Sequence, residues 1–197
     1  MSRSPADWLV RSRTTILASF CLVIAVSTAS VFVFRGAGGT TKPASAAGPD
    51  AVGFSKLNTA APQFDLPLLQ HNGEVRLGML AGRPIVINFW ASSCGICKEE
   101  TPAIAKVSHE VGDQVRFLGV DTLDQRGAAI RFAARYNLRF PMAYDSSGIV
   151  AARYRVPGLP VTFFISETAT RILGVNVGAL TAQSLLRILR KLYGIGA

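Results

Sequence analysis

The chain has 197 residues, of which 49% are apolar, so it is long enough for one packed domain with an appendage. Its net charge of +9 does not indicate nucleic-acid binding, because the arginines are scattered and no basic stretch is interleaved with aromatic residues that stack on bases. A basic surface near an anionic membrane is the simpler interpretation, and three cysteines are too few for a fold held together by disulfides.

The N-terminal part of the chain has the pattern of a membrane anchor. Arg3, Arg11 and Arg13 precede residues 14–34, a stretch without a charged residue, proline or glycine that spans about 30 Å as a helix. The excess of basic residues before this stretch predicts a cytoplasmic N-terminus (residues 1–13) and an extracytoplasmic remainder. A cleaved secretory signal is the alternative, because Ala44-Ser45-Ala46 resembles a cleavage site, although it lies well beyond the apolar stretch. We therefore expect a single-pass protein of the cell membrane with a signal-anchor at residues 14–34.

Residues 35–58 are interpreted as a flexible linker, because Gly, Ala, Ser, Thr and Pro predominate over most of it. From residue 59 to residue 197, short apolar runs alternate with helical patterns. The predicted strands are Gln63–Leu66 and Glu74–Leu77, which form a hairpin, and Ile85–Trp90, Val115–Val120, Val161–Ile165 and Ile172–Val177. The predicted helices are Cys94–Val111, Asp124–Tyr136, Ile149–Tyr154 and a final helix capped by Thr181. This order predicts one three-layer α/β/α domain.

The predicted helices carry apolar stripes that would face the sheet. The stripes consist of Ile104, Val107 and Val111 in the first helix, Ala129, Ile130, Ala133 and Ala134 in the second, and Leu185, Leu186, Leu189 and Leu192 in the last.

Two cysteines, Cys94 and Cys97, lie at the start of the predicted helix that follows the predicted strand Ile85–Trp90. A thiol at a helix start faces unpaired backbone N–H groups and the positive end of the helix dipole, which favour the thiolate. The second thiol follows one helical turn later, so the pair can close a small disulfide and exchange two electrons. An inert structural disulfide is an alternative. Half of a zinc site is another, but His71 and His109 lack ligand spacing, so we predict no metal.

The residues around the cysteines resemble the active-site segment of thioredoxin-fold proteins, in the pattern Phe89-Trp90-Ala91-x-x-Cys94-x-x-Cys97-x-x-Glu100-x-Pro102. The chain is most similar to the membrane-anchored TlpA/ResA/CcmG group of the redoxin branch. Further matches are Phe140-Pro141, Asp145 to Gly148, Tyr154-x-Val156-x-Gly158-x-Pro160 and Thr162-Phe163-Phe164-Ile165. The resemblance implies a thioredoxin-like α/β/α sandwich with an N-terminal hairpin extension over residues 59–197, preceded by one transmembrane helix.

The resemblance also implies roles for single residues. Cys94 would be the attacking cysteine and Cys97 the resolving one, so that the pair forms the redox-active disulfide. Pro160 would be the proline that the family holds cis, facing that disulfide. Glu100 would tune the titration of the thiols, although without the resemblance it reads as an exposed helical glutamate. Asn88 occupies the place of a buried aspartate in cytoplasmic thioredoxins.

The sequence departs from the family pattern in the substrate groove. Ser93 replaces the tryptophan that commonly precedes the first cysteine, and Leu159 replaces the usual threonine before the proline. Trp90 is interpreted as core or as a wall of the groove. These departures bear on which partner protein binds rather than on the chemistry.

Taken together, the residues and the resemblance predict an anchored, extracytoplasmic thiol–disulfide oxidoreductase that needs no organic cofactor. The resemblance favours the reductive direction, with an integral-membrane electron donor and with exported proteins or apo-cytochrome c as clients. The same cysteine pair run in reverse would make a dithiol oxidase. A thiol peroxidase is less favoured, because the chain lacks the Pro-x-x-x-Thr/Ser-x-x-Cys pattern. A non-catalytic docking module is the fourth alternative.

Overall fold

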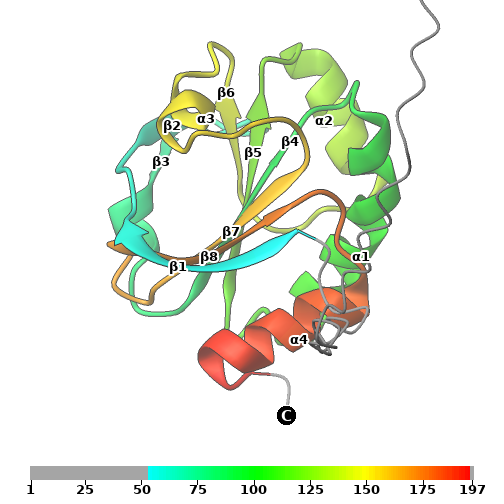
Figure 1. The fold of residues 1–197 in the computed structure, drawn as a ribbon. Helices are drawn as coiled ribbons and strands as arrows, with labels where there is room; N and C mark the ends of the chain where they lie inside the picture. The colour runs from blue at the N-terminus through cyan, green and yellow to red at the C-terminus, as the bar shows by residue number, and fades with distance from the viewer. Residues whose placement is uncertain (1–52, 196–197) are drawn as a thin grey trace, which may run out of the picture. The chain divides into compact units, whose positions relative to one another are not determined.

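The computed structural model describes residues 53–195, which form a mixed six-stranded sheet with helices on both faces and an additional hairpin (Figure 1). The strand order is β1-β8-β7-β4-β5-β6, in which β4, β5 and β6 are parallel and β7 is antiparallel to both β4 and β8. These strands are β1 (Phe54–Ala60), β4 (Ile85–Trp90), β5 (Arg116–Thr122), β6 (Met142–Asp145), β7 (Val161–Ile165) and β8 (Arg171–Val177). This thioredoxin-like sheet places β4 near its centre.

The strand β4 organises the two layers of core. All six of its residues are buried, as expected for a continuous apolar run in the middle of a sheet. Ile85, Ile87 and Phe89 belong to the core on one face of the sheet, whereas Val86 belongs to the core on the other face. Trp90 joins a third cluster, which surrounds the cysteines. Successive side chains of β4 therefore serve opposite faces of the sheet.

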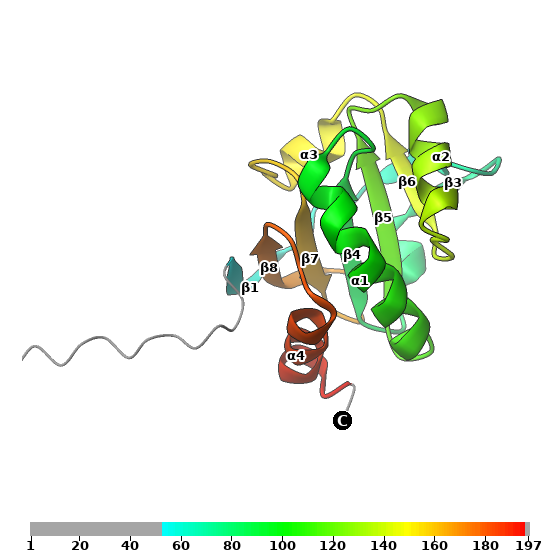
Figure 2. The same ribbon diagram turned by 90° about the vertical axis from the view of Figure 1, so that its right-hand side faces the viewer.

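Three helices cover one face of the sheet and a smaller set of elements covers the other (Figures 1 and 2). The first face carries α1 (Gly95–Val111), α2 (Arg126–Arg135) and α4 (Ala182–Tyr193). The opposite face carries the hairpin of β2 (Asp65–Pro67) and β3 (Glu74–Arg76), the short 3-10 helix η1 (Leu77–Leu80) and α3 (Ile149–Arg153). The hairpin and the helices on both faces confirm the predicted architecture of the folded part.

Local signals fix where the helices begin. Cys94 is the N-cap of α1, and its sulfur accepts a hydrogen bond from the N–H of Cys97 at 3.1 Å. Thr181 caps α4 as predicted, because its hydroxyl accepts from the N–H of Ser184 while the Ser184 hydroxyl accepts from the N–H of Thr181. The predicted apolar stripe of α1 is buried in full.

Four features differ from the prediction. The strand β1 includes residues 54–58, which we expected in the linker; it is an edge strand with mostly exposed side chains, so it lacks an apolar pattern. The four-residue strand β6 was not predicted. The helix α2 begins at Arg126, because Asp124 uses its carboxylate to accept backbone N–H groups before the helix. On α2, Ala129 and Ala133 of the predicted stripe are buried and Ile130 is half-buried, but Ala134 is exposed and Phe132, which was not predicted, is buried in its place.

The membrane-related predictions lie outside the described residues. Within residues 53–195, no helix has both the length and the apolar character needed to span a bilayer. The predicted cytoplasmic N-terminus, the signal-anchor at residues 14–34, most of the linker and Ala44-Ser45-Ala46 all precede residue 53.

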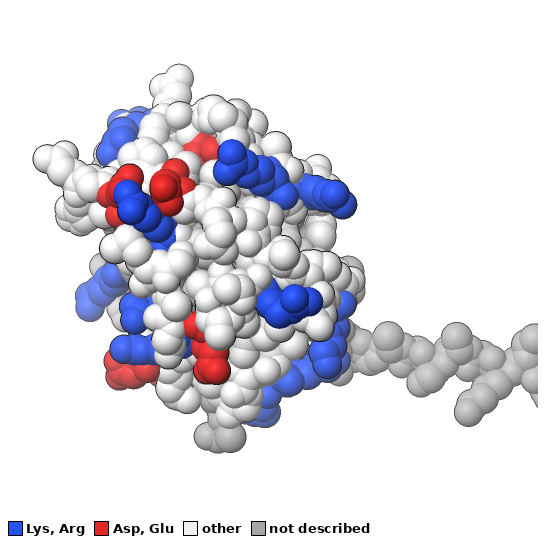
Figure 3. All heavy atoms as spheres, turned by 90° about the vertical axis from the view of Figure 1, so that its left-hand side faces the viewer, with Lys and Arg blue, Asp and Glu red and all other residues white. Residues whose placement is uncertain are grey.

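The Lys and Arg side chains on one face of the described domain do not form a continuous basic surface. On the face shown in Figure 3, Lys and Arg side chains lie in separate groups, with Asp and Glu side chains beside some of them. No continuous basic stripe crosses this face, in agreement with the scattered arginines of the sequence.

Candidate active site

Cys94 and Cys97 form a disulfide at the carboxyl end of β4, with their Cα atoms 5.3 Å apart. The side chain of Cys97 is fully buried, whereas Cys94 is half-buried and its neighbours Ser93, Gly95 and Ile96 are exposed. Only Cys94 is therefore open to a partner in this oxidised state. When the disulfide is reduced, the N-cap position of Cys94 favours its thiolate, because free N–H groups and the helix dipole stabilise negative charge there.

The loop before β7 meets the cysteine segment from the side. The peptide bond between Leu159 and Pro160 is cis, the conformation that the resemblance implies at this position. Because β7 pairs with β4 through Phe89 and Val161, the antiparallel register carries Pro160 to the level of Trp90, just before the cysteines. Leu159 is half-buried and packs in the same apolar cluster as Cys94 and Cys97. The structure thus places Leu159 and Pro160 beside the cysteine segment.

Trp90 lies in the core, which was one of the two positions predicted for it, and not in a wall of the groove. Its side chain is only 2% exposed, and its ring stacks on Phe132 with centroids 4.7 Å apart. It belongs to the same buried cluster as Cys97 and therefore forms part of the core next to the disulfide. In this state the exposed rim beside Cys94 consists instead of Ser93 and Ile96, whose side chain is 52% exposed.

Glu100 is a buried carboxyl on the inner face of α1, one turn after Cys97. Its side chain is 2% exposed; Oε1 accepts a hydrogen bond from Asn88 Nδ2 at 2.8 Å and Oε2 accepts from the N–H of Leu180 at 3.0 Å. Asn88 Nδ2 also donates to the hydroxyl of Thr162 at 3.1 Å. Burial raises the pKa of Glu100 to about 7, although both hydrogen bonds oppose the rise. Glu100 can therefore exchange a proton near neutral pH.

Two further carboxyls below the cysteine segment were not predicted. Asp124 accepts a hydrogen bond from the N–H of Ser92 at 2.5 Å, two residues before Cys94. Asp121, at the end of β5, is fully buried. Burial, together with the charges of Asp124 and Asp145 and a hydrogen bond to Asp124, raises the pKa of Asp121 to about 8. Their sequence, Asp121-Thr122-Leu123-Asp124, carries no motif, and only the pairing of β4 with β5 brings them to the site.

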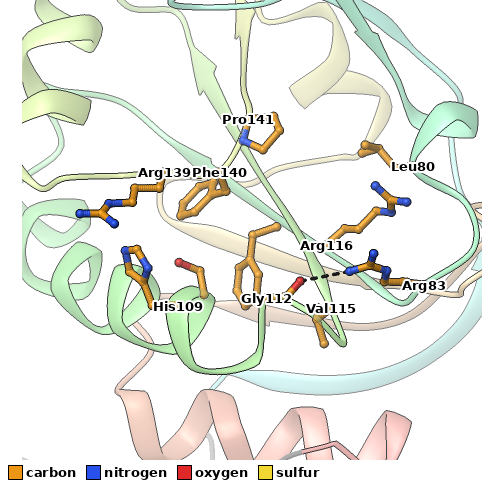
Figure 4. Close-up of a pocket in the computed structure, with 11 residues that line it drawn as sticks. Leu80, Arg83, His109, Gly112, Val115, Arg116, Arg139, Phe140 and Pro141 are labelled. Atoms are coloured by element: carbon orange, nitrogen blue, oxygen red, sulfur yellow. Dashed lines mark hydrogen bonds between the residues drawn. The ribbon is translucent and has the colours of Figure 1, made fainter.

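The domain also has clefts that lie away from the cysteine pair. A cleft of about 270 Å³ opens at the start of β5 and the end of α1, at the opposite end of the sheet from the disulfide (Figure 4). Arg83, His109, Arg116 and Arg139 surround a floor that includes Phe140. Neither cysteine lines this cleft. Cys94 is half-buried at the protein surface, where a macromolecular partner can reach it.

Metal ligation has no support in the described part of the chain. His71 and His109 are both exposed, and within residues 53–195 no group of three or more His, Cys, Asp or Glu side chains is placed to hold a metal ion.

Comparison with known proteins gives a consistent result. A model of the AhpC/TSA family matches residues 57–170. The thiol-disulfide oxidoreductase ResA of Oceanobacillus iheyensis is 30% identical over 134 residues, which cover 66% of this chain and 69% of that protein. The soluble secreted antigen MPT53 of Mycobacterium tuberculosis is 29% identical over 161 residues, covering 82% of this chain and 84% of that protein.

One of the solved structures that resemble this chain is a putative thiol:disulfide interchange protein. The crystal structure of a putative thiol:disulfide interchange protein DsbE from Chlorobium tepidum superposes with a TM-score of 0.63 at 27% identity. The match covers 72% of this chain and 99% of that chain.

Proposed function

This chain belongs to the AhpC/TSA family and is a thiol–disulfide oxidoreductase, and we propose that it reduces disulfides of exported proteins at the outer face of the cell membrane. The observation that carries the proposal is the asymmetry of the cysteine pair. Cys94 is reachable and sits at a helix start, whereas Cys97 is buried behind it. That arrangement suits one sulfur for attack and the other for release.

The reaction begins with the reduced pair. The Cys94 thiolate attacks one sulfur of a client disulfide; a Cys94–client disulfide forms and the other client sulfur leaves as a thiolate, which takes a proton from water. The buried Cys97 then attacks Cys94 Sγ, so that the Cys94–Cys97 disulfide forms and the second client sulfur leaves. Two electrons have passed to the client, and the enzyme is in the oxidised state described above.

In the second step, Glu100 accepts the proton that Cys97 must lose. Both side chains are buried and lie three residues apart on the same face of α1. A carboxyl with a pKa of about 7 is well matched to this task, because a proton acceptor works best near the ambient pH. Asn88 and the N–H of Leu180 hold the carboxylate in place by their hydrogen bonds.

The client is held beside the cis peptide bond of Leu159 and Pro160. Leu159 packs near Cys94 and Ile96 is exposed next to the disulfide, so the rim offers apolar contact to a client segment. An extended client backbone would run along Leu159 while its cysteine reaches Cys94.

The anchor and the direction of electron flow rest on the sequence. Residues 14–34 supply the membrane anchor, and the resemblance to the TlpA/ResA/CcmG group favours reduction of exported proteins or apo-cytochrome c. An integral-membrane electron donor would return the pair to the dithiol state. The reverse reaction, dithiol oxidation, has one observation in its favour: stabilising the Cys94 thiolate at the N-cap favours the reduced enzyme and hence a more oxidising pair.

Two experiments test the proposal. The chain is equilibrated with glutathione buffers; a reduction potential near or below about −270 mV, the value for thioredoxin, supports a reductant, and one near about −120 mV reverses the direction. In the second, a Cys97→Ser variant is expressed in the native host. It should accumulate disulfide-linked clients through Cys94, and a Cys94→Ser variant should not. If neither variant captures a client, the proposal fails.

A further inference from the structure

Asp121 is a buried carboxyl that the proposed reaction does not use. It is fully buried on β5, and no N–H or O–H group of residues 53–195 donates a hydrogen bond to either of its oxygens. No Lys, Arg or His nitrogen of those residues hydrogen-bonds to it, and no positive charge there lowers its pKa. A bare carboxylate in such a place is strongly disfavoured, so the group needs a different state or partner.

Asp124 is that partner. Its Oδ2 accepts the N–H of Ser92 at 2.5 Å and its Oδ1 accepts the N–H of Gln125 at 2.7 Å. Its side chain also hydrogen-bonds to the side chain of Asp121. Two carboxyl groups bond in this way only if one of them carries a proton. Asp124 has the N–H donors that favour an anion, whereas Asp121 has none, so the proton resides on Asp121.

The charged groups around the pair support this assignment. Asp145 on β6 accepts the N–H groups of Val150 and Ala151 at the start of α3, at 3.2 and 2.9 Å. The charge of Asp145 disfavours a second anion at Asp121. From α2, the Arg126 guanidinium lies over the ring of Tyr144 and donates to the carbonyl of Leu68. Burial opposes the ionisation of Asp124, but its hydrogen bonds prevail and lower its pKa.

The pair Asp121 and Asp124 is connected to Cys94 through the turn at residues 91–94. The N–H of Cys94 donates to the carbonyl of Ala91 at 3.1 Å, and the N–H of Ser92, inside this turn, donates to Asp124. The hydroxyl of Tyr144 donates to the backbone carbonyl of Asp124 at 3.0 Å and fixes the loop that carries it. The position of Cys94 thus depends on a carboxylate that is 30 residues away in the sequence.

We propose that Asp121 and Asp124 are a positioning pair that shares one proton: neutral Asp121 donates to the Asp124 carboxylate, which holds the turn that presents Cys94. The inference deepens the proposed function, because it assumes that Cys94 is the attacking sulfur. When Asp121 loses its proton to alkaline solvent, two negative charges face each other in a buried site. The carboxyl groups then separate, and the bond from Asp124 to Ser92 is weakened.

The first test measures the pH at which Asp121 loses its proton. In the oxidised full-length chain, labelled with ¹³C at the aspartate carboxyls, one resonance should titrate above pH 7 and be absent from an Asp121→Asn variant. The resonance lost in an Asp124→Asn variant should show a second step at the same pH in the wild-type chain, because the proton is shared. Titration of Asp121 below about pH 5 would overturn the inference. This measurement needs no enzymatic activity, so it stands even if the proposed function fails.

The second test measures how the ionisation of Asp121 changes the reactivity of the Cys94 thiolate. The rate constant of the pre-reduced chain with oxidised glutathione is divided by the thiolate fraction of Cys94, measured by ultraviolet absorbance. Between pH 7 and pH 9 this corrected rate should fall by up to about tenfold in the wild type, since most of Asp121 ionises in that range. The fall should vanish in Asp121→Asn, whose amide still donates to Asp124, and persist in the control Asp113→Asn, an exposed aspartate. Equal profiles for the wild type and Asp121→Asn would refute the positioning role.

Discussion

Replacing Glu100 by glutamine should change how the stability of the domain depends on pH. A carboxyl whose pKa is 4.5 when exposed and about 7 when folded contributes its full stability below about pH 4.5 and loses it as the pH rises through 7. At about 1.4 kcal/mol per pKa unit, this loss amounts to about 3 kcal/mol. The side chain is 2% exposed, so solvent screens the effect little.

The glutamine also alters two hydrogen bonds. Its single oxygen accepts from Asn88 or from the N–H of Leu180 but not from both, so Glu100→Gln should be less stable than the wild type by about 1–3 kcal/mol near pH 4.5. The deficit should shrink by about 3 kcal/mol toward pH 8, because only the wild type pays for ionisation there. Thus the free energies of unfolding of the two proteins converge or cross as the pH rises.

Urea denaturation of the oxidised chain at several values between pH 4.5 and pH 8 measures this directly. Glu99 is the adjacent, exposed glutamate, so Glu99→Gln is the matched control and should keep the wild-type pH profile. Parallel profiles for Glu100→Gln and the wild type would show that Glu100 ionises normally in the fold, and the argument for its role as proton acceptor would be lost.

Three other substitutions test the fold and the groove. Leu159→Ala should raise the KM for insulin disulfides severalfold and leave the reduction potential unchanged, because it removes client contact rather than sulfur chemistry; a shifted potential with an unchanged KM would contradict this. Thr181→Ala removes the acceptor for the N–H of Ser184 and should lower the free energy of unfolding by about 1 kcal/mol, whereas no loss would mean that the cap is dispensable. Phe132→Ala removes the ring that stacks on Trp90 and should lower the free energy of unfolding by about 3–5 kcal/mol in the same urea assay. A loss below about 1 kcal/mol would show that neighbouring side chains move in to fill the cavity.

The parts of the fold that sequence patterns predicted are those that depend on local signals. The strands β4 and β7 have the predicted bounds, because each is a short apolar run buried on both faces. The helix start at Cys94 and the cap at Thr181 also follow from residues within one turn of each other. The cysteine pair was identified from its own spacing and its place at a helix start, whereas the cis proline and a role for Glu100 came from the family resemblance. The burial of Glu100 was not predicted, since an isolated glutamate on a helix reads as exposed.

The parts that were missed depend on distant contacts. The strand β1 gains its place from backbone pairing with β8 and not from its side chains, so its polar sequence resembled a linker. Glu100 is held by the N–H of Leu180, a backbone group 80 residues away that no side-chain pattern reveals. Asp124 reaches Ser92 across 32 residues only because β4 and β5 are paired in register. Such contacts follow from the assembled sheet rather than from local sequence.

The central claim is that Cys94 is the reachable, ionised sulfur and that Cys97 stands protected behind it. The most direct test is to reduce the full-length chain, treat it briefly with iodoacetamide at pH 7 and quantify each alkylated cysteine by peptide mass spectrometry. We predict rapid modification of Cys94, with Cys97 modified at least tenfold more slowly. Faster modification of Cys97, or equal and slow modification of both, would contradict the account.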